Sequence, residues 1–422
     1  MLKLRTPYVQ QWSFGIEREI ARGMAVEARY VGNHAVKLYR AFDVNEINIF
    51  ENGFLQEFLG AQQNLTANRG VSFAPGAPGT VPLPILNTLF AGLPAASGFA
   101  STGFISNLNL GNVGTMATTL ASSPVYAANR ARLAPNFFRA NPNAAFAHLL
   151  GNGSFSNYHA LQVELRRRFS RGLMAQANYT FSKAITDSEG SLTDLENYYT
   201  LRDLRLDRHR NIHDITQTFV ANFIYELPIG PKRRFFSGGP TVLRKTLEGW
   251  QVQGIVNAHS GPLWMPLANR TSFNQFKVAA NPAVLLGGMS VEDFRRNTGV
   301  YRTPQGVFGF NPQFLNITTN PDGTLQSATL KEGILGPPAP GTFGSFPRNA
   351  LNAPAFFAVD AGIIKRTYFS ERGNVEFRAE FFNLFNRANF TEPGSVFDSI
   401  RFAQIGGAYS ARIGQVALRV NW

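Results

Sequence analysis

Extended stretches in which apolar and polar residues alternate recur along this chain. The clearest covers residues 374–386, where the two classes separate by parity: Val375, Phe377, Ala379 and Phe381 against Asn374, Glu376, Arg378 and Glu380. Because successive side chains of a strand point to opposite faces, the pattern predicts a strand with one apolar and one polar face. One such strand also suits a soluble sandwich, so the fold class depends on how often the pattern returns.

The alternation returns often enough to predict about nine strands. A first hairpin covers residues 8–20 and 24–30, and later strands begin near residues 158, 173, 215, 250, 357, 374 and 412. Short Gly-containing turns are expected at 21–23, 170–172 and 371–373, and a longer basic turn at 228–246. Turns therefore follow strands one, three, five and seven, and long loops follow strands two, four, six and eight.

Two long segments, about 32–156 and 261–352, lose the alternation and are rich in Asn, Ala, Gly and Pro. Pieces such as residues 50–63 are expected to form short helices. Loops of this length are uncommon in compact soluble domains, whereas outer-membrane barrels carry long extracellular loops between short periplasmic turns. We therefore predict an all-β fold, an antiparallel transmembrane β-barrel with long extracellular loops, over residues 1–422.

The strand count makes this barrel a partial one. Bacterial single-chain barrels have an even number of strands and keep both ends in the periplasm. An odd count that starts outside and ends inside is expected for the C-terminal portion of a larger barrel. Alone, such a sheet leaves two unpaired edges, which favour aggregation.

The composition of the chain excludes several kinds of site and partner. The chain has no cysteine, which excludes disulfides and thiolate metal sites. Its net charge of +13 comes from arginines spread over strands and turns, so no nucleic-acid partner is expected. The longest uncharged run, 70–129, is broken by prolines, so a membrane location requires a barrel. No export signal follows Met1, and the chain is expected to be a piece of a longer outer-membrane protein.

The last residues form an amphipathic strand with four apolar positions on one face: Val416, Leu418, Val420 and Trp422. This ending resembles the terminal strand of bacterial outer-membrane barrels, whose final aromatic residue is read by the barrel assembly machinery. An ordinary amphipathic strand that happens to end in Trp is the alternative interpretation.

Residues 378–390, RAEFFNLFNRANF, resemble the penultimate strand of TonB-dependent outer-membrane receptors, and more narrowly the Oar-like group with a carboxypeptidase-regulatory-like N-terminal domain. Further similar segments follow in the family's order: 6–14, 158–169, 179–184, 207–210, 225–228, 249–252 and 260–262. The resemblance implies a barrel of about 22 strands around a plug. It also implies coupling to the TonB energy complex. Plug, coupling motif and N-terminal domain are absent from this sequence, which matches only the barrel's C-terminal portion.

Together these features predict a segment of a receptor that takes up a large substrate across the outer membrane. The polar residues expected to face the lumen and contact the plug are Glu164, Arg166, Gln176, Asn178, Glu376, Arg378 and Glu380. The two long loops would capture ligand outside. An adhesive surface protein that binds through its loops, and a gene fragment without function, remain as alternatives. The expected partners are outer-membrane lipid, the assembly machinery, the plug and the TonB complex.

Catalytic chemistry has little support. Asp207, Arg208, His209 and Arg210, with His213 and Asp214, form a polar cluster that suits either a metal site or a salt-bridged junction between loop and strand. Ser182 and His159 lack the surroundings of a nucleophile. We expect no enzyme, cofactor or metal. Five aromatic residues are candidates for the membrane-interface girdles: Trp12, Tyr30, Tyr179, Trp250 and Trp422.

Overall fold

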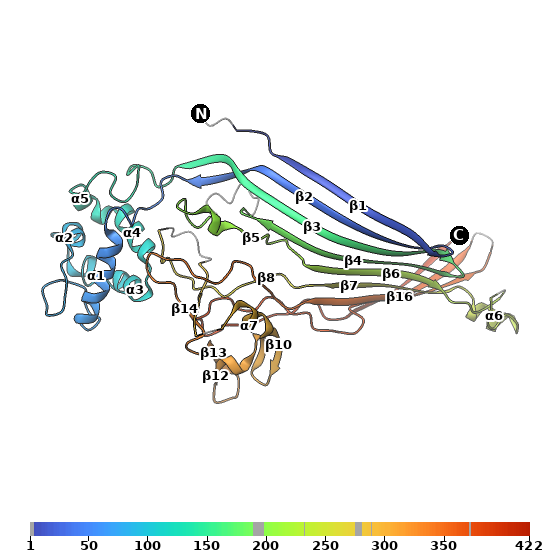
Figure 1. The fold of residues 1–422 in the computed structure, drawn as a ribbon. Helices are drawn as coiled ribbons and strands as arrows, with labels where there is room; N and C mark the ends of the chain where they lie inside the picture. Colours follow the sequence, from blue (N-terminus) through green and yellow to red (C-terminus); the bar gives the residue numbers. More distant parts are fainter. Residues whose placement is uncertain (1–3, 189–197, 232, 275–280, 288, 371–372) are drawn as a thin grey trace.

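The computed structural model describes residues 4–188, 198–231, 233–274, 281–287, 289–370 and 373–422. Its main feature is one antiparallel sheet whose long strands pair in chain order (Figure 1). Within the described residues these are β1 (Tyr8–Ala21), β2 (Met24–Asp43), β3 (His148–Ser170), β4 (Leu173–Thr186), β6 (Gln217–Glu226), β7 (Trp250–His259), β16 (Phe356–Tyr368), β17 (Asn374–Phe382) and β19 (Ile413–Asn421). A short strand, β5 (His209–Arg210), pairs with β4.

The register keeps one face polar and the other apolar across the sheet. Glu27 lies opposite both Glu17 and Glu164, whereas Tyr30 lies opposite both Phe14 and Leu161. Residues directly opposite in an antiparallel pair share a face, so these rows confirm the predicted alternation. A register slip of one residue would exchange the two faces, which is why the alternation fixes the pairing.

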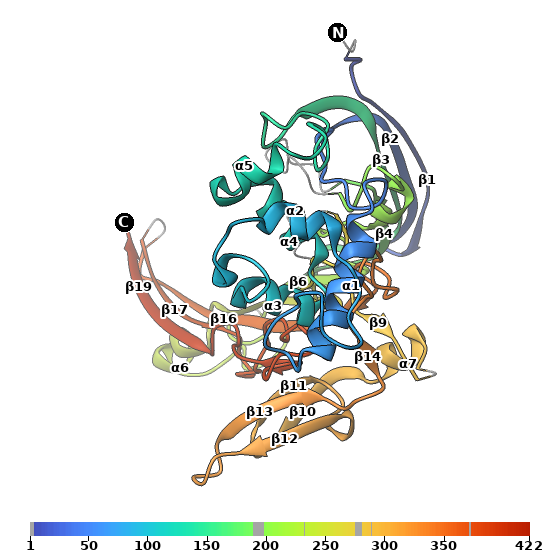
Figure 2. The same cartoon turned by 90° about the vertical axis from the view of Figure 1, so that its left-hand side faces the viewer.

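The sheet is bent but open. Figure 2 looks along the strands and shows an arc with β1 at one end and β19 at the other. In the described part of the chain, β1 pairs with β2 alone and β19 with β17 alone. Glu376 on the polar face is only 5% exposed, whereas Phe377 beside it is 40% exposed. Side chains crowd on the concave side of a curved sheet, so the polar face is the inner one.

The short turns lie at one end of the sheet and the long loops at the other (Figure 1). Two-residue turns join β1 to β2 and β3 to β4 at the same end as the chain's C-terminus (Figure 1). The predicted turn at 371–373 lies largely outside the described residues. The longer turn at this end contains a helix, α6 (Thr241–Leu247). At the far end, β2 and β3 run for 20 and 23 residues, well beyond the 9–11 that cross a bilayer.

The first long loop is folded, which corrects two expectations. The strand before the loop, β2, continues to Asp43, and the strand after it, β3, begins at His148. The connection is therefore shorter than the predicted 32–156. Between them lie α1 (Phe54–Ala67), α2 (Pro84–Phe90), η1 (Ala95–Ser97), α3 (Thr102–Leu110), α4 (Val113–Ser122), η2 (Pro124–Tyr126) and α5 (Ala127–Arg130). The fold is therefore mostly β and not all-β.

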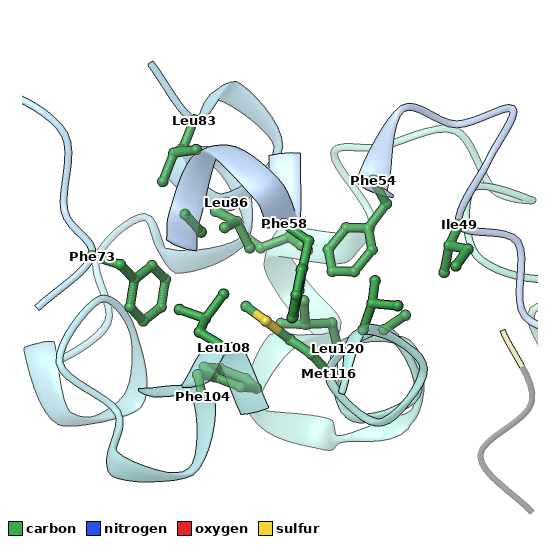
Figure 3. Packing of buried hydrophobic residues seen from close by; sticks show 14 of the residues in the cluster. Ile49, Phe54, Phe58, Phe73, Leu83, Leu86, Phe104, Leu108, Met116 and Leu120 are labelled. Carbon is green, nitrogen blue, oxygen red and sulfur yellow. The ribbon is translucent and has the colours of Figure 1, made fainter. Parts of the chain in front are cut away.

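These helices form a subdomain with its own core (Figure 3). Phe54, Phe58 and Met116 are fully buried there. Local sequence sets the helix ends: the Ser101 hydroxyl accepts a hydrogen bond from the Phe104 amide, and Gly111 ends α3 with a φ of 70°. That left-handed conformation costs glycine nothing, because glycine has no Cβ.

The segment 261–352 is likewise not an irregular loop. It contains β8 (Leu263–Trp264), β9 (Val284–Leu285), α7 (Val291–Arg296), β10 (Thr298–Thr303), β11 (Gly306–Phe310), η4 (Pro312–Phe314), β12 (Leu315–Thr319), β13 (Leu325–Leu330), β14 (Leu335–Gly336) and β15 (Leu351–Asn352). β11 pairs with β18 (Gln404–Ile405) from the next loop, so two loops build one β subdomain. Its core includes Trp264, Phe294 and Phe402.

Candidate functional site

The seven predicted lumen-facing residues lie on the inner, polar face, in two groups. On β3 and β4, Gln176 donates to the Glu164 carboxylate at 3.2 Å, and Arg166 pairs with Glu17 of β1. Asn178 lies opposite Glu164 in the register. These groups are half-exposed, so their ion pairs contribute little to stability but keep the surface hydrated.

The second group lies on β17. Glu376 accepts hydrogen bonds from Arg366, at 2.6 Å, and from Arg378. Glu380 accepts from Gln415 of β19 at 2.7 Å. β6, β7 and β16 separate the two groups, so the structure does not bring the seven residues together as one site.

Between the groups, the inner face carries a recess of about 320 Å³. The inner-face residues that line it are Asn222, Ile224, Gln253, Ile255, Asp360, Gly362, Glu380 and Phe382. A Cβ at Gly362 would lie 3.2 Å from the Gln253 amide nitrogen and 3.4 Å from Glu380 Cγ. The missing side chain therefore helps to open the recess, which combines two carboxylates with apolar walls. Sequence reasoning missed it, because Gln253 and Glu380, which face Gly362, lie on other strands.

The residues of the polar cluster at 207–210 take part in two separate sets of contacts, one around Asp207 and one around Arg210. Asp207 is fully buried, accepts a hydrogen bond from the Tyr199 amide and lies 2.8 Å from Arg40 of β2. Arg210 instead pairs with Asp214 at 2.7 Å and bonds Thr216 and Asn352. Arg208 is exposed. The arrangement joins loops to strand ends, and no group of three or more potential metal ligands occurs among the described residues.

Asp207 belongs to a junction where three of the long loops meet. Glu46, just after β2, accepts hydrogen bonds from the Leu201 amide at 3.0 Å and from Asn274 at 3.1 Å, and so joins its own loop to the loops after β4 and β7. Burial raises the pKa of Asp207, and the nearby Arg40 opposes that rise. Burial also raises the pKa of Glu46. The sequence offered a salt-bridged junction at residues 207–210 as one interpretation, but no pattern indicated the partners Arg40 and Glu46, because they are far away in the chain.

Four of the candidate girdle residues, Trp12, Tyr30, Tyr179 and Trp250, lie on the apolar face by the register of their strands, and Trp422 follows the end of β19. Trp12 lies over Gly32 of β2, and the Tyr30 hydroxyl is 2.7 Å from His159 Nδ1. Ser182 is on the opposite face from His159 and donates to the Ile215 carbonyl. The two residues considered as a nucleophile and its base are therefore separated by the sheet.

The C-terminal strand presents its apolar residues outward along a free edge. Val416 and Leu418 are 72% and 70% exposed, and Trp422 is 94% exposed. Of the helices that the structure describes, none combines the length and apolar character needed to cross a membrane.

The profile of the family described as "Outer membrane beta barrel domain" matches residues 2–415. This chain belongs to that family. It is accordingly an outer-membrane protein. No curated protein matches the chain.

Several solved structures are similar in part. The outer membrane transporter YddB from Escherichia coli is 7% identical with a TM-score of 0.38, over 99% of this chain and 33% of that one. The ferripyoverdine receptor of Pseudomonas aeruginosa bound to ferripyoverdine is 9% identical with a TM-score of 0.34, over 99% and 27%. A FadL homologue from Pseudomonas aeruginosa is 8% identical, with a TM-score of 0.20, over 98% and 67%. The chain thus spans a third or less of the first two structures.

Proposed function

We propose that this chain is the C-terminal part of the barrel of a TonB-dependent receptor of the Oar-like group, which takes up a large substrate across the outer membrane. The observation that carries the proposal is the open antiparallel sheet of nine long strands, counted among the described residues. With an odd count, its first and last strands run in the same direction. Further antiparallel strands between them would complete a barrel wide enough to hold a plug.

In this proposal the inner face lines the passage. Glu164, Arg166 and Glu376 are held by residues of other strands, and Arg378 by Glu376 of its own strand, so that they would offer fixed hydrogen-bonding groups to the plug. Substrate would pass when the TonB complex changes the plug's conformation. The proposal assigns no catalytic chemistry and no cofactor to this chain. Val416, Leu418, Val420 and Trp422 would be read by the barrel assembly machinery.

The extracellular subdomains would bind the ligand before it enters. Each has its own apolar core, and hydrogen bonds such as the one from the Gly114 amide to the Thr271 carbonyl, at 2.9 Å, link the two. A preorganised cap of this kind suits a large ligand that contacts several loops. The same observation favours the runner-up, an adhesive surface protein that binds through these subdomains without transport.

The DNA upstream of Met1 tests the proposal. Transport predicts an in-frame continuation that encodes a signal peptide, a plug, a TonB-coupling motif and further strands. The purified full gene product should then bind the purified periplasmic domain of TonB. An upstream continuation with strands but no plug would favour the adhesive protein, and a stop codon with a promoter immediately before Met1 would leave a gene fragment.

A further inference from the structure

The turn between β6 and β7, at the periplasmic end of the sheet, is built unlike the others. The turns after β1 and β3 hold two residues each, whereas this one runs from Leu227 to Gly249 and includes α6. Outer-membrane barrels keep periplasmic turns short. The lumen-facing and ligand-binding roles proposed above leave this segment unexplained.

The turn exposes four large apolar side chains. Phe235 is 48% exposed, Phe236 67%, Val242 78% and Leu243 46%. Scattered exposed apolar residues are ordinary, but two exposed apolar pairs within nine residues of a surface turn favour a nonaqueous contact.

Hydrogen bonds fix the end of α6 to the lipid-facing side of the sheet. The Trp250 indole donates to the Thr246 carbonyl at 2.8 Å, and the Lys365 ammonium donates to the Lys245 carbonyl at 2.8 Å. Trp250 and Lys365 lie opposite each other in the register, on the outer face. The helix is thus held beside the barrel wall at the membrane rim, and not beneath the lumen.

Two cations of the turn have no carboxylate partner among the described residues. Arg233 pairs with Glu226 at 2.9 Å, and Lys245 pairs with Glu248 at 3.1 Å. Arg234 and Arg244 are exposed, and the only ring or charge contact described for either is that of Arg234 with the Phe235 ring, 5.3 Å away. Free guanidinium groups beside exposed apolar residues are typical of segments that lie in the interface of an anionic membrane.

We propose that residues 233–247 form an interfacial anchor. Phe235, Phe236, Val242 and Leu243 enter the periplasmic leaflet, and Arg234 and Arg244 bind the phosphate groups of anionic phospholipid there. The argument depends on the outer-membrane location alone, so it stands or falls independently of transport. A periplasmic protein that covers the same residues is the competing occupant.

Spin labels test the anchor directly, because the chain has no native cysteine. The full gene product, with any cysteine outside residues 1–422 replaced by serine, is reconstituted in nanodiscs of phosphatidylcholine, with or without phosphatidylglycerol, after labelling at Phe236→Cys or Val242→Cys. Both labels should collide with oxygen at least threefold more often than with a water-soluble nickel complex. Arg22→Cys, in the short turn at the same end, should show the reverse. Leu418→Cys, on the outer face of β19, identifies the samples in which the sheet has inserted.

Phosphatidylglycerol should increase the preference of both labels for oxygen about twofold. Arg234→Gln with Arg244→Gln should abolish that increase, whereas the matched pair Arg22→Gln and Arg171→Gln should leave it unchanged. In inserted samples, labels at 236 and 242 that collide mainly with nickel would overturn the proposal. So would labels shielded from both reagents, which would indicate protein packing in place of lipid, or an equal response of the two arginine pairs.

Discussion

The guanidinium of Arg40 lies 2.8 Å from the carboxylate of Asp207, and their side chains are only 4% and 0% exposed. Arg40 is near the extracellular end of β2, and Asp207 ends η3 (Leu204–Asp207) in the loop between β4 and β6. Asp187, at the end of β4, lies 3.7 Å from the same guanidinium. One buried ion pair thus joins the strand that leads into the helical subdomain to the loop that follows β4.

Replacing Arg40 should open this junction. Arg40→Met leaves Asp207 charged and buried without its closest cation, and the loss of one partner of a buried pair costs about 3–5 kcal/mol. Hydrogen exchange at the Tyr199 amide, which donates to Asp207, should accelerate by roughly a hundredfold to a few thousandfold. Arg166→Met is the control, since its ion pair with Glu17 is about half-exposed and contributes roughly 0–1 kcal/mol. Equal effects of the two variants would contradict the assigned role of the buried pair.

The helical subdomain should unfold without the sheet. Phe58 is fully buried in its core, and Phe58→Ala should destabilise the subdomain by about 3–5 kcal/mol. Limited proteolysis should then cut between Asp43 and His148 while β1–β4 stay protected. Leu59→Ala, at a neighbouring residue that is 39% exposed, should leave the cleavage pattern unchanged. Simultaneous cleavage of the strands would show that the loop and sheet form one folding unit.

Trp12 should be displaced by a side chain at Gly32. A Cβ there would lie 2.4 Å from the indole nitrogen, closer than atoms can approach. Gly32→Val should therefore cost roughly 1–3 kcal/mol through overpacking, seen as a lower urea midpoint. Gly15→Val is the matched control, because a Cβ at Gly15 meets Arg29 at an ordinary 3.5 Å. A midpoint that shifts equally in both variants would be inconsistent with Trp12 packing on Gly32.

The start of α7 should weaken in acid. Asp293 forms a capping box with Ser290, and hydrogen bonds from the Ser290 hydroxyl and amide, together with Arg296, lower the pKa of Asp293 from 3.8 to about 2. Because the folded pKa is below the unfolded one, this stabilisation is complete above about 3.8 and is lost as the pH falls toward about 2. Amide protection in the first turn of α7 should fall over that range. In Asp293→Asn it should not change with pH, and a pH-independent native helix would refute the assignment.

The alternation predicted the strands where one face meets lipid and the other water, because both faces then constrain the sequence. The alternation did not predict the last part of β2, from about Lys37 to Asp43, which the loops cover. Lys37 has a φ of 57°, and the register with β3 shifts on either side of Leu38, so the period of two is lost. Ala41 and Asp43 are both buried there, which removes the apolar–polar contrast. The strand end was therefore mistaken for loop.

The prediction of short helix near residues 50–63 is confirmed by α1, whereas the rest of the helical subdomain and the β subdomain were missed for a related reason. Phe54, Phe58, Ala61 and Leu65 have helical spacing, but the surrounding Asn, Gly, Thr and Ala residues resemble loop composition. The short strands of the β subdomain find partners in another loop, as β11 does with β18. Contacts such as Arg40 with Asp207, and the recess over Gly362, depend on segments that only the folded chain brings together.

The central claim is that this sheet is part of a larger barrel, and engineered disulfides test it most directly. β1 and β19 run in the same direction and, over the described residues, do not pair. Ile16→Cys is combined in turn with Val416→Cys, Leu418→Cys and Val420→Cys in the full gene product in the outer membrane. We predict no disulfide in any of the three, because other strands separate the two edges. Phe14→Cys with Tyr30→Cys, directly opposite in the register, should form one. Efficient bonding between β1 and β19 would mean that the nine strands close on themselves, and would contradict the account.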